Sequence, residues 1–572
     1  MINLFDNNKF SKLWKSILRV SAFLNVFAIL VSAQDHKSWS YNLNLYEVNT
    51  RNYTASGTFN EFRLNHLDRL KEMGVGIIWF MPVNPIGSKN KLGSLGSPYS
   101  VKDYFAVNPE LGTLEDFKTL VKAIHSKGMF VIIDWVANHT SWDNVLTATN
   151  PEWYVKNTSG NFTSPAGTNW SDVIQLDYSK RGLRDYMIGA MSFWVKEVGV
   201  DGFRCDAVSF MPGDFWSEAN SKLKAINPKL FMLAEDDKYA YQFLGFDMSY
   251  AWGMYGFGSG VLKRIASGSN NANDFAHYMH TENISYDQHY RLYFTSNHDE
   301  NSWYGTDKEL FGNFSETFAA LTATVGGMQL VYGGQEAGLS KRLAFFDKDR
   351  IIWQTSPLNN VYSTLNKLKK ENSALWNGFS ENFYKRVKTN NEDRLFSFVR
   401  KKGSDKIFAV FNLSGNNYDA VISDTNSYGT YEDVFTKQRV SYTQPFSVSV
   451  QPYGYKIFKK YDSSTNVEKH SITNRTFQLM QNYPNPFNPS TAISYVLQAA
   501  SHVTLKVYDV LGREVVTLVN EFKPAGTHST LFLPPVAQGK AGVLSSLFAS
   551  GVYFYRLTTP TTSITKKMIL AR

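Results

Sequence analysis

The arrangement of this chain is best understood from one stretch, Gly202-Phe203-Arg204-Cys205-Asp206-Ala207. It follows the apolar run Val198-Gly199-Val200, which indicates a short buried strand. Side chains two residues apart on a strand point to the same face, so we expect Arg204 and Asp206 to lie together at the strand's C-terminal end. In isolation, an Arg and an Asp spaced in this way are usually only a solvated structural ion pair.

Three other strand-like runs also end in polar or titratable residues. The first leads into the segment Asp134 to His139, the second ends at Glu235, and the third leads into His298-Asp299. A single strand that ends in a carboxylate carries little information. Four such strands predict one shared site, at which the ends of the strands meet.

The composition is that of a large globular protein. A chain of 572 residues exceeds the size of one compact core, which predicts about two to four domains. The aromatic fraction of 15% is high, and aromatic rings suit stacking on sugars, although core packing accounts for most of them. The net charge of +9 comes from scattered basic residues without a dense stripe, which argues against nucleic-acid binding. The single cysteine, Cys205, excludes an internal disulfide framework and is interpreted as a core residue.

The N-terminus has the pattern of a secretory signal peptide over residues 1–33. Four basic residues precede a short apolar run at 20–31, and small residues stand before Gln34. We predict cleavage after Ala33; an uncleaved membrane anchor is the alternative, although the run is short for a bilayer span. No later segment is long and apolar enough to cross a membrane.

From residue 39 onward, the sequence alternates between predicted strands and helices. Amphipathic helices are expected at 59–73 and 113–127, and a forty-residue connection after the third strand, at about 140–180, contains three tryptophans that favour a small inserted subdomain. Eight strands with intervening helices predict an α/β fold, a (β/α)₈ TIM barrel over residues 39–380. The strands are expected at 43–48, 76–80, 130–134, 200–206, 231–235, 245–248, 292–294 and 329–332.

Beyond the barrel the periodicity changes to short alternating runs, which are typical of β structure. Residues 381–461 are predicted to form an all-β module, residues 462–474 a polar linker, and residues 475–572 a further β-rich domain. In a (β/α)₈ barrel, catalytic residues lie at the C-terminal ends of the strands, where the residues identified above all fall.

The polar residues at these strand ends suit the hydrolysis of a glycosidic bond. That reaction needs a carboxylate nucleophile and a carboxylic acid that protonates the leaving oxygen. Arg204 would keep Asp206 ionised for the first role, and burial near other carboxylates would keep Glu235 protonated for the second. Asp299 could stabilise positive charge on the sugar, and His139 and His298 could donate hydrogen bonds to it.

These motifs resemble those of the α-amylase family of retaining glycoside hydrolases. The resemblance covers Asp134 to His139, Gly202 to Asp206, Glu235 and Asn297-His298-Asp299, in the family's order. It implies catalytic roles for Asp206, Glu235 and Asp299 and substrate contacts by Tyr99, His139, Arg204 and His298, with Tyr99 stacking under the sugar. It also implies a C-terminal β-sandwich, α-1,4-glucosidic bonds as substrate, and carboxyl groups about 5 to 5.5 Å apart.

Two further features of the sequence concern the length of the substrate and the binding of a metal ion. Ser209 and Phe210 stand where many α-amylases have Lys and His, which favours dextrins or maltooligosaccharides over long starch chains. The resemblance also implies that Asn138 and Asp177, with a backbone carbonyl near position 210, could hold a structural calcium ion. Alternatively, these two side chains only hydrogen-bond the loops. No organic cofactor is expected.

The C-terminal segment resembles the sorting domain of the bacterial type IX secretion system. The resemblance rests on Asn482-Tyr483-Pro484-Asn485-Pro486-Phe487-Asn488-Pro489, on 507–514 and on 550–555, with 534–547 as an apparent insertion. It implies secretion machinery as a partner and a secreted or cell-surface location. A fibronectin-like carbohydrate-binding module is the alternative.

Three functions remain open on the sequence alone. The first is a secreted α-glucan hydrolase, and the second is an α-glucan transglycosylase or trehalose-forming relative, in which a sugar hydroxyl intercepts the covalent intermediate. The third is a non-catalytic surface glucan-binding protein, which the presence of all three carboxylates disfavours.

Overall fold

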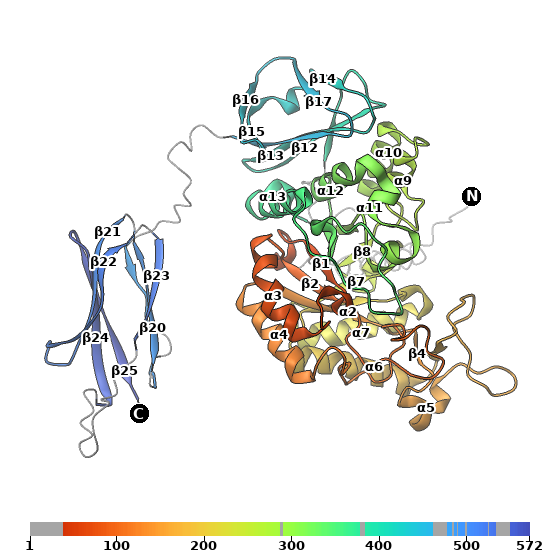
Figure 1. Cartoon of the computed structure of the whole chain (residues 1–572), viewed down its shortest axis with the longest axis horizontal. Helices are drawn as coiled ribbons and strands as arrows, with labels where there is room; N and C mark the ends of the chain where they lie inside the picture. The colour runs from red at the N-terminus through yellow and green to blue at the C-terminus, as the bar shows by residue number, and fades with distance from the viewer. Residues whose placement is uncertain are drawn as a thin grey trace, which may run out of the picture. The chain divides into compact units, whose positions relative to one another are not determined.

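The computed structural model divides the chain into two compact units, Met1–Tyr461 and Asp462–Arg572 (Figure 1). It describes residues 38–285, 290–377, 384–461, 477–482, 485–488, 490–497, 500–523, 526–532 and 549–571. The predicted signal peptide, the 462–474 linker and the 534–547 insertion lie outside these residues.

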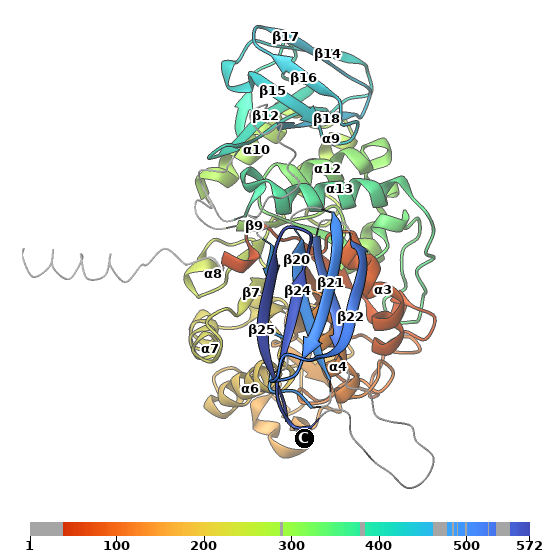
Figure 2. The ribbon, with the colours of Figure 1, turned by 90° about the vertical axis from the view of Figure 1, so that its left-hand side faces the viewer.

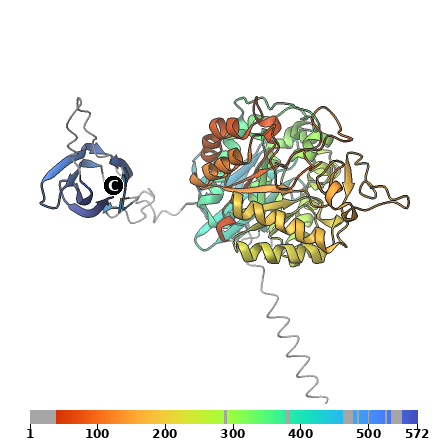
Figure 3. The same cartoon turned by 90° about the horizontal axis from the view of Figure 1, so that it is seen from below.

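The first unit is built on a closed barrel of parallel strands, which confirms the predicted fold. The strands are almost entirely buried apolar runs, as expected where helices cover the outside of a parallel sheet and side chains fill its inside. Seen from below, the helices surround the strands (Figure 3). In barrel order the strands are β1 (Leu45–Val48), β10 (Met328–Tyr332), β9 (Tyr290–Tyr293), β8 (Met248–Tyr250), β7 (Phe231–Ala234), β6 (Gly202–Cys205), β3 (Phe130–Trp135) and β2 (Ile77–Phe80).

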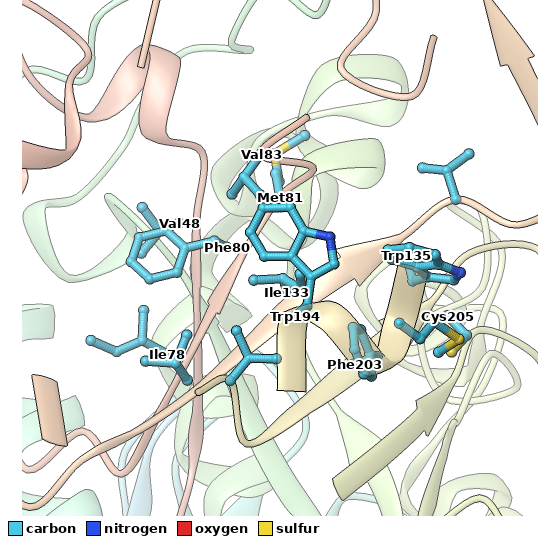
Figure 4. Close-up of a cluster of buried hydrophobic side chains, with 14 of the residues drawn as sticks. Val48, Ile78, Phe80, Met81, Val83, Ile133, Trp135, Trp194, Phe203 and Cys205 are labelled. Carbon is cyan, nitrogen blue, oxygen red and sulfur yellow. The ribbon is translucent and has the colours of Figure 1, made fainter. Parts of the chain in front are cut away.

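The helices bury their apolar stripes against the outside of the barrel. Thr113 and Asp116 form a reciprocal capping box at the start of α4, close to the start that the sequence predicts. Side chains such as Phe80, Ile133, Trp194 and Phe203 fill the space between strands and helices (Figure 4). The main helices are α3 (Phe59–Glu72), α4 (Leu114–Ser126), α6 (Arg181–Phe193), α7 (Gly213–Ile226), α10 (Ala272–Ser285), α12 (Ser315–Thr324) and α13 (Pro357–Glu371).

The strand predicted at 245–248 differs most from its prediction. The sequence places it at 245–248, whereas β8 covers Met248–Tyr250. Gly245 has φ +93 and belongs to the turn that follows α8 (Ala240–Phe243). A backbone of that kind cannot continue a strand, so the chain becomes extended only after it.

The long connection after β3 forms a small subdomain. Its two strands, β4 (His139–Ser141) and β5 (Val173–Gln175), pair antiparallel, and α5 (Leu146–Thr149) lies between them in sequence. The backbone N–H of Leu176 donates to the carbonyl of Asn138 at 3.1 Å, so the end of this connection is bound to the segment that follows β3.

A β module follows the barrel within the same unit. Phe275 of α10 packs edge-on against Phe396, and the Tyr455 hydroxyl bonds Glu316 of α12 at 2.9 Å, so the module is joined to the barrel's helices. A six-stranded sheet consists of β11 (Lys385–Val387), β12 (Leu395–Lys402), β13 (Asp405–Asn412), β18 (Tyr455–Lys460), β15 (Gly429–Asp433) and β16 (Arg439–Tyr442). A two-stranded sheet of β14 (Tyr418–Ile422) and β17 (Phe446–Val450) shares its buried core.

The described part of the second unit contains strands and no helix (Figure 2). It has its own buried core. One sheet orders β19 (Gln478–Leu479), β20 (Thr491–Leu497) and β23 (Gly526–Phe532). The other orders β22 (Glu514–Lys523), β21 (Ser501–Tyr508), β24 (Gly551–Thr558) and β25 (Ser563–Leu570). Among the described residues, we find no helix with the length and apolar character of a membrane span.

Candidate active site

The guanidinium of Arg204 is the centre of the site at the C-terminal ends of the strands. It is fully buried, and its Nη1 lies 2.9 Å from Asp134 Oδ1 and 3.0 Å from Asp206 Oδ1. Its Nη2 lies 2.5 Å from Glu235 Oε1. Arg204 and Asp206 therefore lie side by side, as predicted from their spacing in the sequence. The same guanidinium also contacts Asp134 and Glu235, so it connects acidic side chains from three strand ends.

A sharp turn after β6 brings the segments of Asp206 and Glu235 together. Ala207 has φ +44, a left-handed conformation that is unusual for a residue with a side chain. Its backbone N–H donates to Glu235 Oε2 at 2.7 Å, and the Glu235 N–H donates to the Cys205 carbonyl at 3.1 Å. Both carboxylates keep partial exposure, 12% for the Asp206 side chain and 15% for that of Glu235.

Burial changes the acidity of this cluster. Burial raises the pKa of Glu235 to about 8; Arg204 opposes the rise, while the charges of Asp206 and Asp299 add to it. Burial also raises the pKa of Asp134 to about 6, despite the adjacent Arg204. At neutral pH the site therefore holds Glu235 as a protonated acid, which is the state that the sequence predicts for it.

His298 connects the far side of the site. Its Nδ1 lies 2.5 Å from Glu47 Oε1, and its Nε2 lies 2.7 Å from the Tyr99 hydroxyl and 3.2 Å from Asp299 Oδ2. Burial opposes a charged imidazole, but Asp299 and Glu47 together raise the pKa of His298 well above its ordinary value. The imidazolium in turn holds the pKa of Asp299 below its usual range, against the effect of burial.

Tyr99 lies between these two parts of the site. Its hydroxyl donates to Asp134 Oδ2 at 2.9 Å, and its ring stacks on that of His298 with centroids 5.4 Å apart. The guanidinium of Arg204 lies 5.8 Å from the centre of the same ring. The predicted residues Tyr99, His298 and Asp299 therefore form one connected network with Arg204.

His139 lies at the start of β4, at the edge of this network. It is buried, and burial lowers the pKa of its imidazole, so that the ring is neutral at physiological pH. Its ring packs 5.3 Å from that of Trp170, which in turn lies 5.8 Å from the exposed ring of Phe210.

A family comparison identifies the class of this protein. The model of the α-amylase catalytic domain matches residues 63–442, about two thirds of the chain. The chain belongs to the α-amylase family. It is therefore a glycoside hydrolase by family, and the resemblance of its strand-end motifs is confirmed.

Individual members of the α-amylase family match over most of this chain. Alpha-amylase 2 of Dictyoglomus thermophilum is 24% identical over 438 residues, which are 71% of this chain and 70% of that protein. The structure of a noncanonic maltogenic α-amylase, AmyB from Thermotoga neapolitana, matches with a TM-score of 0.66 and 28% identity, over 74% of this chain and all of that one. An α-amylase structure from Lactobacillus plantarum gives 0.64 and 27%, over 73% of this chain and 99% of that one.

The C-terminal unit of this α-amylase family member matches a different family. The model of a secretion system C-terminal sorting domain matches residues 481–571, which confirms the second resemblance. A tail of this type indicates export to the cell surface or the exterior.

The two side chains considered for calcium, Asn138 and Asp177, both have protein partners. The Asp177 carboxylate accepts the Ser179 N–H at 3.0 Å and pairs with Lys180, and Asn138 Nδ2 lies 3.3 Å from His139 Nδ1. Within the described ranges, no group of three or more His, Cys, Asp or Glu side chains gathers as a candidate metal site. A structural calcium ion held by Asn138, Asp177 and a backbone carbonyl near position 210 stays a prediction, as does the alternative that the two side chains only order the loops, and no step below depends on a metal.

Sequence reasoning missed several residues of this α-amylase site. Glu47 is fully buried against His298, and the Tyr250 hydroxyl accepts a hydrogen bond from Arg204 Nε at 3.3 Å. Trp79 places its ring 5.3 Å from the same guanidinium. Glu47 had a usable signal, because a charged residue inside the apolar strand β1 needs a buried partner. Tyr250 and Trp79 had none, since aromatic residues are common in strands.

Proposed function

We propose that this chain is a secreted retaining hydrolase of α-1,4-glucosidic bonds in starch, dextrins or maltooligosaccharides. Asp206 is the nucleophile, Glu235 the acid and base, and Asp299 the stabiliser of the transition state. The observation that carries the proposal is the pairing of Asp206 and Glu235 on one buried guanidinium, with burial raising the pKa of Glu235 to about 8, so that Glu235 holds its proton at neutral pH.

In the first step, Glu235 gives its proton to the glycosidic oxygen while an oxygen of Asp206 attacks the anomeric carbon. The bond from that carbon to the leaving oxygen breaks, which yields a free sugar end and a glycosyl ester on Asp206. In the second step, Glu235, now a carboxylate, takes a proton from water as the water oxygen attacks the same carbon. The ester bond breaks, and two inversions give net retention.

The surrounding network supports the charges that these steps create. Positive charge develops on the sugar ring, and Asp299, whose pKa is held low, provides a carboxylate to stabilise it. The face of Tyr99 and the imidazole of His298 suit contacts to the ring and hydroxyls of the cleaved sugar, and His139 suits a further hydroxyl. The separation of about 5 to 5.5 Å between the two carboxyl groups stays a prediction.

The test combines products with trapping of the nucleophile. The enzyme is assayed on starch, pullulan, cyclodextrins and short maltooligosaccharides, with products resolved by length and by anomeric configuration. A fluorinated α-glucosyl fluoride that stalls the second step should label Asp206, as mass spectrometry of a digest would show. Full activity of Asp206→Asn, or release of the β-anomer from an α-linked substrate, would contradict the mechanism.

Transglycosylation is the second candidate function, and Phe210 favours it. This residue stands four positions after Asp206, is 41% exposed and packs near Trp170, so it could hold an acceptor sugar in place of water. With maltoheptaose at high concentration, chains longer than seven glucoses would establish glucan transfer, whereas shorter products alone favour hydrolysis.

Secretion is proposed to depend on the C-terminal unit. The sorting-domain match supports recognition of residues 475–572 by type IX secretion machinery, after export by an N-terminal signal peptide. A chain that ends at Tyr461 should remain inside the outer membrane of a host with this machinery, while the full chain reaches the surface or medium. Equal export of both would contradict the proposal.

A further inference from the structure

The loop between β8 and α9 (Val261–Ala266) exposes an aromatic ring in a disfavoured backbone conformation. Phe257 is 55% exposed and has φ +45, and it lies between Gly256 and Gly258, which also have positive φ. A bulky residue in this region is a rare outlier that surrounding contacts must maintain. Neither core packing nor backbone geometry accounts for a phenylalanine here.

Two acidic side chains hold this loop, and both come from the segments that carry catalytic carboxylates. Glu300, which follows Asp299 directly, accepts the Phe257 N–H at 2.9 Å and is itself buried. Asp237, two residues after Glu235, accepts the Gly253 N–H at 3.2 Å. The position of Phe257 is therefore fixed relative to the segments of Glu235 and Asp299.

The ring of Phe257 belongs to a larger aromatic surface. It stacks on Trp252 with centroids 4.6 Å apart and planes at 20°, and it lies 6.1 Å from Tyr304, which is 41% exposed. The neighbouring Trp303 is 50% exposed and follows Asp299 by four residues. We name Trp252, Phe257, Trp303 and Tyr304 the aromatic platform.

The platform connects to the ring predicted to stack under the cleaved sugar. Trp303 lies 5.2 Å from Phe345, and Phe345 lies 6.1 Å from Tyr99 with nearly parallel planes. The exposure of these rings therefore increases from buried Tyr99 through half-buried Phe345 to exposed Trp303. Flat apolar faces of this kind bind the C–H faces of sugar rings through dispersion and burial.

We propose that the aromatic platform binds a glucose unit of the substrate other than the one cleaved, with Phe257 as the ring that stacks on it. This inference rests on the proposed function and makes the substrate class narrower: an α-glucan chain long enough to reach from Tyr99 to Phe257. The enzyme then favours maltooligosaccharides over disaccharides and aryl glucosides.

The test removes the aromatic ring of Phe257 with a residue that can adopt the same left-handed backbone conformation. Phe257→Asn is suitable because asparagine tolerates a left-handed conformation. Phe257→Tyr keeps the flat face and serves as the rescue variant. Phe522→Asn is the matched control, because Phe522 is 67% exposed but lies on β22 in the other compact unit. Each variant is made in the full chain, in the active enzyme and in the Asp206→Asn background.

Binding of maltoheptaose by the Asp206→Asn background is measured by calorimetry, so that the platform is tested whether or not turnover occurs. We expect Phe257→Asn to weaken binding by about 3- to 10-fold, with Phe257→Tyr and Phe522→Asn close to the background. In the active enzyme, the ratio of kcat/KM for maltoheptaose to that for 4-nitrophenyl α-glucoside should fall by the same factor.

Unchanged affinity for maltoheptaose in Phe257→Asn would contradict sugar binding by the aromatic platform. A loss of kcat/KM that is equal for long and short substrates would also contradict it. The latter result would mean that the loop only supports Glu235 and Asp299. If the unsubstituted enzyme cleaves no α-glucan, the proposed function fails, and the calorimetric comparison still decides whether Phe257 binds the chain.

Discussion

At the scale of single residues, the site places two buried cations next to acidic side chains. Arg204 is a permanent cation that three carboxyl groups share, and His298 is a second cation between Glu47 and Asp299. Because these groups are buried, each protonation state depends on its neighbours. Changes of one charge should therefore alter the pH dependence of activity as well as its size.

The first prediction concerns Glu235. Its pKa of about 8 means that activity should fall as the pH rises through that value, because the general acid loses its proton. Glu235→Gln should lower kcat by roughly 10²- to 10⁴-fold on substrates with poor leaving groups, and it should remove the alkaline limb of the kcat/KM profile. A profile whose alkaline limb survives in Glu235→Gln would assign that limb to another group.

The same residue should reduce the stability of the enzyme at alkaline pH. A carboxyl group whose pKa is raised in the folded state binds its proton there and loses it earlier in the unfolded chain. The wild-type protein therefore loses stability between about pH 4.3 and pH 8 through this group, and Glu235→Gln does not. We expect the melting temperature of Glu235→Gln, relative to wild type, to increase from pH 5 to pH 9 in calorimetry.

Glu47 is predicted to keep His298 charged. Glu47→Gln keeps the size of the side chain but removes the negative charge at 2.5 Å from Nδ1, so the pKa of His298 should fall. His298 then loses its proton as the pH rises, and Asp299 loses its charged neighbour. Activity relative to wild type should decrease with increasing pH, as measured by kcat/KM between pH 5 and pH 9.

Glu336→Gln is the control for this change. Glu336 is also a buried glutamate at the barrel, but it pairs with Tyr46 and Arg69 and has no contact with His298. A pH effect of equal size in Glu336→Gln would show that any lost buried charge produces it, and would contradict a specific role for Glu47.

At the scale of elements, close packing between neighbouring strands sets which residues fit at the site. A Cβ at Gly202 would lie 2.0 Å from the carbonyl oxygen of Phe231 on β7. The glycine that begins the quoted stretch therefore allows β6 and β7 to pair, and that pairing places Arg204 and Glu235 at adjacent strand ends. An apolar pattern indicates the strands but not this contact.

Gly202→Ala should consequently destabilise the barrel by roughly 1–3 kcal/mol or more, because backbone atoms must move apart. Denaturant unfolding measures the change. Gly189→Ala is the matched control, since Gly189 lies within α6 and a Cβ there meets nothing within 4 Å. Alanine is the better helix former by roughly 0.5–1 kcal/mol, so the control should be neutral or more stable. Equal destabilisation of both variants would contradict the steric explanation.

At the scale of the whole molecule, catalysis and sorting are separated into two compact units with separate cores. Every residue of the candidate site belongs to the first unit. We expect a chain that ends at Tyr461 to keep kcat/KM within about twofold of the full chain and to unfold in one transition fewer, as calorimetry would show. A large loss of activity would mean that the second unit supports the site.

Much of this organisation follows from the sequence. Local apolar runs predict the eight strands, because a strand buried on both faces must be apolar along its length. The polar residues at their ends predict the site, because the ends of parallel strands meet at one face of the barrel. Strand β8 differs most from its prediction, because the turn at Gly245 delays its start.

The sequence by itself determined the barrel and the catalytic candidates Asp206, Glu235 and Asp299, since these rest on local patterns along the chain. The structure groups the barrel and the β module that follows it into one compact unit. The tertiary structure alone revealed the sharing of Arg204 among three carboxylates, the support of His298 by Glu47, and the exposed surface around Phe257. These features join residues up to 251 positions apart, and only the closure of the barrel brings their side chains within contact distance.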